Sequence, residues 1–333
     1  MDQKLHHQEG GSVMKRRTKI WLMIAGFLVL TGGILFAGAM SVLGWDFTRL
    51  STIKYETNTY EISDAFRDLS LTTDTADIVF ALSDDGTCKV ECYEEENAKH
   101  SVAIENDTLV VSVNNQKSWY DYIGISFGSP KITVYLPKAE YKALLIRNTA
   151  GNIQIPGDYS FENVDISLRT GDVNFCASVS ESAKINTNTG NICAENTSVG
   201  SLALSVATGN VTASNVTCNN NLTVNVSTGK AYLTDLTCES AASGGSTGAI
   251  ALSNVIAAKK ISIERSTGNI TFNRCDAPEI YAKTSTGDVT GSLLSSKIFT
   301  AQTNTGSIDV PKSENGGKCE ITTSTGNIKI TVE

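Results

Sequence analysis

The stretch ERSTGNITF, from Glu264 to Phe272, joins a turn to the start of a strand. Its middle, Ser-Thr-Gly-Asn, consists of turn-forming residues, whereas Ile270 and Phe272 alternate with polar residues as in a half-buried strand. Nearly the same phrase returns further along the chain as STGDVTG, NTGSIDV and STGNIKI. Self-similarity at a fixed period predicts a repeat protein, so the spacing of this phrase is the strongest indication of the fold.

The glycine of this phrase recurs every 19 or 20 residues. Glycine tolerates a positive φ, and the Asn or Asp that often follows it accepts turn geometry as well. Each copy is therefore predicted to be a corner of the chain. After an initial copy at Gly151, the predicted structural corners are Gly171, Gly190, Gly209, Gly229, Gly248, Gly268, Gly287, Gly306 and Gly326.

Apolar residues alternate with Ser, Thr and Asn on both sides of each corner. Around Gly268 the apolar positions are Ile261, Ile263, Ile270 and Phe272. The apolar phase shifts by one residue at the glycine, as a corner between two strands requires. The predicted fold is all-β, a single-stranded parallel β-solenoid of about ten to eleven coils of 19–20 residues each. With a strand spacing of ~4.8 Å, ten coils make a rod of about 45–50 Å.

Two coils depart from this pattern. LSLTTDTADIVF places Ala76 at the glycine position, with Leu69, Leu71, Ile78 and Phe80 on the apolar columns, which predicts a degenerate first coil. In a later coil, small residues stand where the neighbouring coils carry larger apolar side chains. That coil is expected to open most easily, because a thin interior loses dispersion contacts; its small residues are Ala241, Ser243 and Gly245.

The predicted organisation follows from these patterns. Residues 66–143 hold the first coil and the strands that cap it, because the ends of a solenoid need cover. Residues 144–333 hold the β-solenoid repeats. Before them, residues 1–19 are predicted to be a cytoplasmic tail, 20–44 a transmembrane helix and 45–65 a juxtamembrane linker.

The apolar segment 20–44 is long enough to cross a bilayer, which needs roughly 20 residues. Four basic residues in 15–19 precede it, so the amino end is expected in the cytoplasm and the carboxyl-terminal domain outside the cell membrane. A cleaved signal peptide is the alternative, because Ala37 and Ala39 offer small residues for cleavage. Met14 is predicted to be the true start, since purine-rich Glu-Gly-Gly codons precede it; residues 1–13 would then be over-annotated.

The formal net charge of −8 excludes a basic surface for nucleic acid. The eight cysteines contain no CxxC pair and are interpreted as small apolar core residues. Cys218 and Cys238 lie nine residues after successive corner glycines, so they are expected close together on adjacent coils. The three histidines, His6, His7 and His100, all lie outside the repeats.

One aromatic cluster stands out in the capping region. KSWYDYIGISF contains the candidate partner-binding residues Trp119, Tyr120, Tyr122 and Phe127. Aromatic side chains on a loop often anchor an interface. Covering the first coil and resting against the membrane are the alternative roles.

This layout resembles the bacterial putative-adhesin family of β-strand-repeat proteins, a domain of unknown function found in LiaG-like membrane-anchored envelope proteins. The matching residues are the corners from TAGNI at 149–153 to STGNI at 324–328, and upstream DTLVVSV, KITVYLP and IRNTAGNI. The resemblance covers residues 60–333. It implies a membrane-anchored surface protein linked to envelope stress, and it carries no catalytic residues.

Catalysis is not expected from this sequence. Polysaccharide-acting enzymes on β-helix scaffolds need carboxylates on adjacent coils, whereas Asp172 and Asp288 share a column but lie six coils apart. Neither a metal nor a cofactor motif is present, so no cofactor is expected. The expected function is surface binding, adhesin-like, or structural support in the envelope, with a polysaccharide-acting enzyme as the alternative.

The expected partners are the membrane and an envelope protein or wall polymer. Self-association through the C-terminal coil is a further expectation. It rests on the final stretch NIKITVE, residues 327–333, which is predicted to lie on an unfinished coil with a free edge.

Overall fold

The computed structural model describes residues 16–46, 53–115 and 128–333. They belong to two compact units, and the first contains helix α1 (Arg16–Val42). At 1.5 Å per residue its 27 residues are about 40 Å long, and its most apolar 18-residue window has a mean hydropathy of 2.3. By length and composition the helix fits a membrane span, and it fits a signal peptide equally.

The second unit consists of the β-strands, which form one sheet. Its amino-terminal strands are β1 (Tyr55–Ile62), β2 (Asp68–Thr75), β3 (Asp77–Leu82), β4 (Cys88–Glu95), β5 (Ala98–Glu105), β6 (Thr108–Asn115) and β7 (Lys131–Leu136). The repeats begin with β8 (Glu140–Ala150), β9 (Ile153–Ile155), β10 (Ser160–Thr170), β11 (Val173–Phe175), β12 (Ser178–Thr189), β13 (Ile192–Thr208), β14 (Val211–Cys218) and β15 (Asn221–Thr228). They continue with β16 (Ala231–Thr247), β17 (Ile250–Thr267), β18 (Ile270–Cys275), β19 (Glu279–Thr286), β20 (Val289–Leu293), β21 (Lys297–Thr305), β22 (Ile308–Asp309), β23 (Gly317–Thr325) and β24 (Ile328–Val332).

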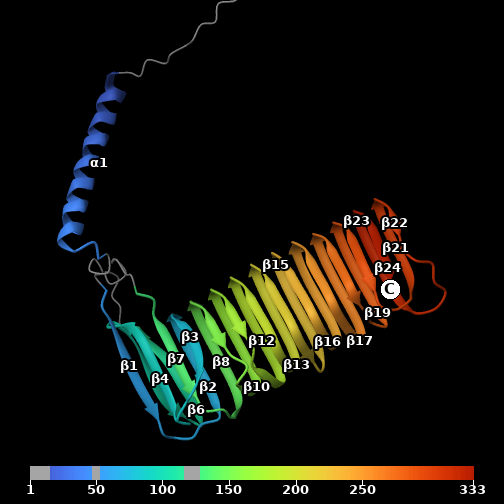
Figure 1. The fold of residues 1–333 in the computed structure, drawn as a ribbon, viewed down its shortest axis with the longest axis horizontal. Helices are drawn as coiled ribbons and strands as arrows, with labels where there is room; N and C mark the ends of the chain where they lie inside the picture. Colours follow the sequence, from blue (N-terminus) through green and yellow to red (C-terminus); the bar gives the residue numbers. More distant parts are fainter. Residues whose placement is uncertain (1–15, 47–52, 116–127) are drawn as a thin grey trace, which may run out of the picture. The chain divides into compact units, whose positions relative to one another are not determined.

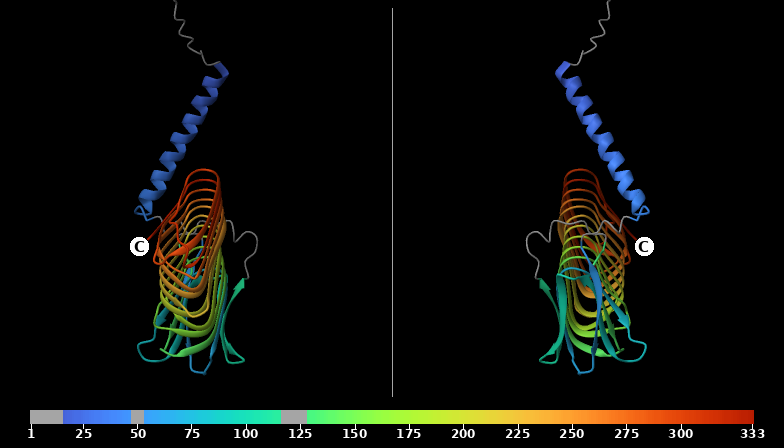
Figure 2. Two further views of the ribbon diagram at one scale, coloured as in Figure 1. Left: turned by 90° about the vertical axis from the view of Figure 1, so that its right-hand side faces the viewer. Right: turned by 90° about the vertical axis from the view of Figure 1, so that its left-hand side faces the viewer.

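Successive coils pair in parallel and in register. Ile263 pairs with Ser243 of the preceding coil and with Ala282 of the following one, so each apolar column runs along the unit. Seen along that direction, the coils stack as flattened ovals (Figure 2), and their strands lie side by side in Figure 1. The predicted all-β solenoid with one amino-terminal apolar helix is confirmed. The core is the narrow space between the two walls of the ovals, where Ile263, Ile270 and Phe272 are fully buried.

The corner glycines lie where the chain passes from one wall to the other. From Gly171 to Gly326 their φ angles lie between 123° and 150°, a region that side chains rarely adopt. The stacking adds a second reason for glycine, because a Cβ on Gly190 would overlap the carbonyl oxygen of Gly171 on the coil before it. Each corner also donates its N–H along the stack; Gly190, for example, donates to Thr208 O at 3.0 Å.

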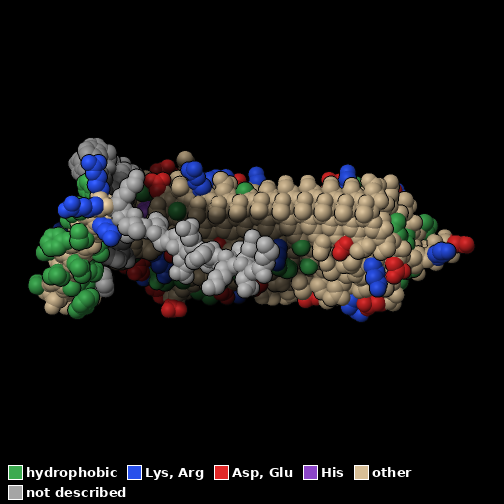
Figure 3. Space-filling model, turned by 90° about the horizontal axis from the view of Figure 1, so that it is seen from above, with side chains coloured by type: hydrophobic (Ala, Val, Ile, Leu, Met, Phe, Trp, Pro, Cys, Tyr) green, Lys and Arg blue, Asp and Glu red, His purple; other side chains and the backbone are tan. Residues whose placement is uncertain are grey.

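Asn or Asp follows seven of the ten corner glycines and forms a ladder along the corner, which is interrupted at Lys230 and Ala249. Asp172 Oδ1 accepts the N–H of Asn191 at 2.7 Å, and Asn191 Oδ1 accepts the N–H of Asn210 at 3.0 Å. The side-chain oxygen therefore satisfies an amide of the next coil, which explains the preference for Asn and Asp. Figure 3 shows the molecule from above, relative to the view of Figure 1. Regular rows of uncharged residues and backbone run along the β unit, and the charged side chains lie mostly at its margins.

A second corner lies six residues after the glycine, and the sequence pattern did not reveal it. Its residues adopt the left-handed conformation without being glycine, with φ between 51° and 54°. Four of the five are Asn or Asp, the residue types that tolerate this region best. Side-chain bonds link neighbouring copies, such as Asn215 Nδ2 to Asn196 Oδ1 at 2.8 Å. The five residues are Asn196, Asn215, Asp235, Asn254 and Arg274.

The amino-terminal coil is formed by β2 and β3, with Ala76 buried at the corner. Leu69 pairs with Leu144 and Ile78 with Ile153, so the predicted register of the degenerate coil is confirmed. On its other side β2 pairs with β6 and β3 with β7, both in parallel. Antiparallel strands then cover these two, with β5 on β6 and β4 on β7. The linker predicted for 45–65 needs correction, because Tyr55–Ile62 form β1, which pairs with β4.

The carboxyl-terminal end is stacked out of chain order. Thr325 of β23 pairs with Thr286 on one side and with Thr305 on the other, so β23 lies between β19 and β21. Likewise Ile328 of β24 lies between Val289 and Ile308. The prediction that the final stretch occupies an unfinished coil is therefore wrong. The outermost coil is β21–β22, and the last strands fill the layer that the chain skipped.

In the coil with the small inward residues Ala241, Ser243 and Gly245, the interior is filled by the Arg265 side chain of the following coil. Arg265 is 4% exposed, and its Nη1 donates to Val226 O at 2.8 Å. A Cβ on Gly245 would overlap this guanidinium, so the small residues make room for it. Burial lowers the pKa of Arg265, and in the part of the chain that the structure describes its Nε and Nη2 have no hydrogen-bond partner. Among the described residues, no acidic side chain forms an ion pair with this buried cation, which makes its burial costly.

We expect Ile270→Asp to lower the free energy of unfolding by at least about 3 kcal/mol, because it removes a buried side chain and buries a charge. Thr271→Asp is the matched control, since Thr271 is the exposed neighbour on the same strand. Thermal unfolding followed by circular dichroism measures both. Equal stability of the two variants would contradict the assignment of the core columns.

Arg265→Met should raise the free energy of unfolding by about 1–2 kcal/mol, because it keeps the volume and removes an uncompensated buried charge. Lys260→Met, on an exposed position of the same strand, should change it by less than about 0.5 kcal/mol. Urea titration of both variants would measure the difference. A destabilised Arg265→Met variant would mean that the guanidinium stabilises the coil through its bond to Val226.

Candidate functional site

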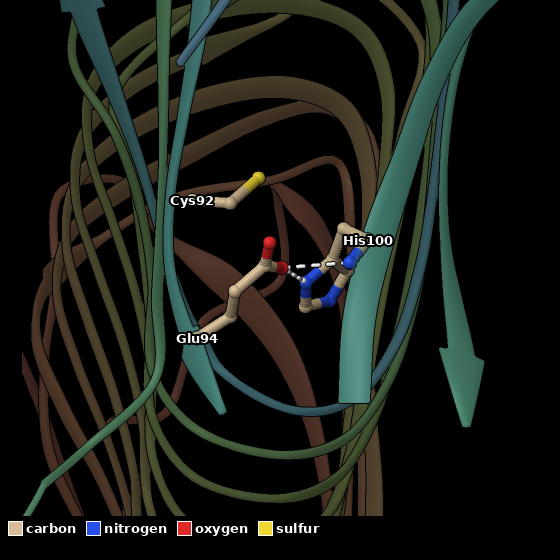
Figure 4. A group of neighbouring side chains, drawn as sticks. All are labelled: Cys92, Glu94 and His100. Atoms are coloured by element: carbon tan, nitrogen blue, oxygen red, sulfur yellow. Dashed lines mark hydrogen bonds and ion pairs between the residues drawn. The ribbon is translucent and has the colours of Figure 1, made fainter. Parts of the chain in front are cut away.

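A polar cluster lies inside the capped end of the β unit, formed by Cys92 and Glu94 of β4 and His100 of β5 (Figure 4). Cys92 and Glu94 are two residues apart, so both point to the inner face of their strand. The strands separate after their shared turn, because β4 pairs with β7 and β5 pairs with β6. His100 therefore faces the other two residues from the opposite wall.

Glu94 is the centre of the hydrogen bonds in this cluster. Its Oε2 accepts from His100 Nδ1 at 2.6 Å and from the His100 backbone N–H at 2.7 Å. Its Oε1 accepts from Asn58 Nδ2 at 2.7 Å. The Glu94 side chain has no exposed surface, so its carboxylate depends wholly on these donors.

The imidazole of His100 is held on both sides. The ring Nε2 lies 2.8 Å from Thr73 Oγ1. The backbone oxygen of His100 accepts a hydrogen bond from Tyr60 Oη at 2.8 Å. Burial, and next the charge of Glu94, raise the pKa of Tyr60. Burial is also the main cause that raises the pKa of the Cys92 thiol to about 12, so this thiol is neutral at ordinary pH.

Thr73, His100 and Glu94 occur in the order hydroxyl, imidazole and carboxylate, as in nucleophilic triads. Thr73 is only 3% exposed, and the adjoining pocket is narrow. This pocket lies between Thr73–Thr75 of β2 and the residues Glu95, Ala98 and His100. A polysaccharide or peptide chain could not bring a scissile bond to the hydroxyl, whereas a water molecule or a small ion could reach the imidazole.

The sequence alone does not reveal this cluster. The sequence pattern indicates only that His100 lies outside the repeats, and its neighbours in space lie on strands that pair out of sequence order. The alternating ECYEE of β4 was the available signal, because it places a cysteine and an acid on one face. The aromatic candidates Trp119, Tyr120, Tyr122 and Phe127 lie outside the described residues.

The cysteine expectations can be compared with the structure directly. Cys218 and Cys238 are buried free thiols, one step beyond the paired residues Thr217 and Thr237 on adjacent coils. Cys88 and Cys92 share the inner face of β4. Six of the eight cysteines are buried, as expected of small core residues, whereas the expectation is wrong for Cys176 and Cys193, which are only half-buried.

The free end at β21–β22 is a second candidate site. Ile308 is 46% exposed, whereas Ile328 and Val289 in the same column are fully buried. Within the described residues, β21 pairs only with β23 and β22 only with β24. The next segment lies against part of this end, where Phe299, Val310 and residues 311–314 line a shallow pocket. The end therefore combines a free strand edge with a partly covered apolar floor.

A family model described as Toastrack DUF4097 matches residues 66–230 and 143–254, which together span more than half of the chain. The chain belongs to the Toastrack DUF4097 family. The family resemblance inferred from the corner motifs is therefore confirmed. No curated protein matches this sequence.

Several solved bacterial structures match this chain at low sequence identity. A putative adhesin from Bacteroides fragilis is 16% identical, with 84% of this chain and 97% of that chain covered and a TM-score of 0.42. A putative lipid binding protein from Parabacteroides distasonis is also 16% identical, with coverage of 83% and 97% and a TM-score of 0.46. A putative adhesin from Parabacteroides merdae is 16% identical, with coverage of 84% and 96% and a TM-score of 0.43.

Glu94→Gln should lower the free energy of unfolding by about 2–3 kcal/mol, because the amide cannot accept all three bonds and presents donors to His100. Glu91→Gln, on the outer face of the same strand, should cost less than about 0.5 kcal/mol, since its contact with Lys89 is an exposed pair. Chemical denaturation of the two variants measures this contrast. Similar stabilities would mean that the buried carboxylate does not hold the cap in place.

Proposed function

We propose that this protein is a membrane-anchored surface protein of the bacterial envelope that acts by binding, with the β-solenoid as a rigid spacer and β21–β22 as its binding end. Helix α1 is the proposed single-pass anchor, with the amino terminus in the cytoplasm and the β unit outside. The apolar helix and the basic residues before it support this orientation. The link to envelope stress implied by the family resemblance belongs to the same proposal.

Binding is proposed rather than catalysis because of how the polar residues are distributed. The outer surface of the coils carries repeated Ser, Thr and Asn side chains whose hydrogen bonds run along the stack. The buried carboxylate Glu94 is closed off from large substrates. A regular surface of this kind suits a spacer or a docking surface, and no cofactor is needed for it.

The single observation that carries the proposal is the exposure of Ile308. In every coil beneath it, the same column is covered by the next layer, as at Ile328 and Val289. An apolar floor beside a free strand edge favours pairing with another polypeptide. The proposed binding surface, named here the distal edge, consists of Phe299, Ile308 and Val310 on the floor and of Ile298 on the outer face of β21.

We infer that the occupant of the distal edge is a second copy of this chain. Two identical edges can pair across a twofold axis, which satisfies the free backbone groups of both. Lys312 and Glu314 follow the edge on the same short segment, so a twofold arrangement can place opposite charges across from one another. The alternative occupants are an envelope protein and a wall polymer, and the test must distinguish them from a second copy of the chain.

Light scattering at increasing protein concentration tests this on residues 55–333, which include the whole compact β unit. We expect dimers for the native sequence and monomers for Ile308→Lys, which places a charge on the floor without disturbing a covered position. Thr271→Lys, at an exposed position in the middle of the unit, should leave the dimer intact.

A native fragment that stays monomeric at all concentrations would overturn the second copy as occupant. Binding of that monomer to purified cell-wall polymer, lost in Ile308→Lys, would assign the distal edge to the polymer instead. Dimers that persist in Ile308→Lys would place the interface elsewhere.

A further inference from the structure

The Cys92, Glu94 and His100 side chains bring three different metal-binding atoms to one buried point. The Cys92 sulfur, a Glu94 carboxylate oxygen and a His100 ring nitrogen all lie within 4.8 Å of one another. Cys92 is fully buried, as is Glu94, and His100 is 5% exposed. In the apolar columns of the repeats these inward positions carry aliphatic residues, so three polar groups together need an explanation.

We propose that Cys92, Glu94 and His100 form a binding site for a divalent transition metal of the Zn²⁺ type. Thiolate, imidazole and carboxylate are the ligands that zinc takes in proteins, and three protein ligands leave a fourth position for solvent. The sulfur and nitrogen ligands disfavour Ca²⁺ and Mg²⁺, which take oxygen ligands. The proposal does not depend on the binding function of the distal edge.

In the present structure, two of the proposed ligand atoms lie closer together than they would around a bound metal ion. Nδ1 of His100 donates a hydrogen bond to Oε2 of Glu94 over 2.6 Å. In a tetrahedral zinc site with bonds of about 2.0–2.3 Å, ligand atoms are roughly 3.3–3.8 Å apart. Binding of the ion would require the Nε2–H tautomer of His100, which frees Nδ1, and it would release the Cys92 thiol proton to solvent; the carboxylate and the imidazole would move apart by about 1 Å. Small rotations of two side chains provide this movement without a change in the strands.

The groups around the cluster are placed as the supporting shell of a metal site. Metal-bound histidines usually donate their other ring N–H to a fixed acceptor, and bound carboxylates are themselves hydrogen-bonded. Thr73 Oγ1 stands 2.8 Å from Nε2 of His100, which leaves Nδ1 to face the metal. Asn58 Nδ2 holds Oε1 of Glu94 at 2.7 Å and leaves Oε2 for the ion.

A narrow pocket borders the same imidazole. The narrow pocket beside Thr73 is lined by His100 together with Asp74 and Glu95. The pocket is wide enough for an ion or water but not for a larger ligand, which matches the proposed occupant.

Titration of the full-length chain with Co²⁺, after removal of bound metal with a chelator, tests the site in detergent solution. We expect a thiolate-to-cobalt charge-transfer absorption that saturates at one ion per chain and disappears on addition of Zn²⁺. His6 and His7 cannot produce this band, because it requires a thiolate ligand. Zn²⁺ should also raise the thermal unfolding temperature, because the ion binds the folded cap.

The variants separate the proposed ligands from the rest of the core. Cys92→Ser should abolish the charge-transfer band, whereas Cys88→Ser, on the same face of β4 and also buried, should keep it. Thr73→Val retains all three ligands and should weaken Co²⁺ binding by about 10–100-fold, because it removes the support of Nε2.

The native chain alone can overturn the proposal. If it shows no charge-transfer band, or a band that Cys88→Ser removes and Cys92→Ser does not, the cluster is not a metal site. An unchanged affinity in Thr73→Val would overturn the role assigned to Thr73. If Cys92→Ser does not fold, the presence or absence of the band in the native chain and in Cys88→Ser still decides the question.

Discussion

The close contact between successive corner glycines is the constraint on which the rest of the β unit depends. Each corner places its Cα directly over the carbonyl of the glycine on the neighbouring coil, and no side chain fits there. This contact keeps the coils one strand spacing apart at one side of the oval. In-register pairing of both walls follows from it, and so does the alignment of the apolar columns.

At both ends of the solenoid, strands pair out of sequence order and cover a coil that would otherwise have a free edge. At the amino end, β6 and β7 pair with the outer side of the first coil, and antiparallel strands cover them. At the carboxyl end, the last strands fill a skipped layer, and Glu333 is tied to Arg274 by an ion pair. Lys297, which begins the outermost coil, is buried against Asp276 at 2.5 Å. These ion pairs stabilise the strands at the carboxyl-terminal end that depart from the regular repeat.

The sequence predicted the coils, the corner and the degenerate copy at Ala76 because each depends on local alternation and on a recurring glycine. It could not predict the order of the last coils, because β21 and β23 carry equivalent patterns and either fits against β19. The second corner was missed because left-handed Asn196 and Asn215 resemble ordinary polar residues in a strand. The cluster at His100 was missed for a different reason. It forms between opposite walls, whose facing residues no repeat period specifies.

The interleaved final layer has a consequence for how the chain is made and how it fails. A ribosome produces β21–β22 before the strands that must lie beneath them, so this part of the stack stays incomplete until β23 and β24 have been synthesised. A chain that lost those strands would lack an inner layer rather than a tip, and its outermost coil would have nothing to rest on. The exposed end therefore depends on two strands that follow it in the chain, β23 and β24.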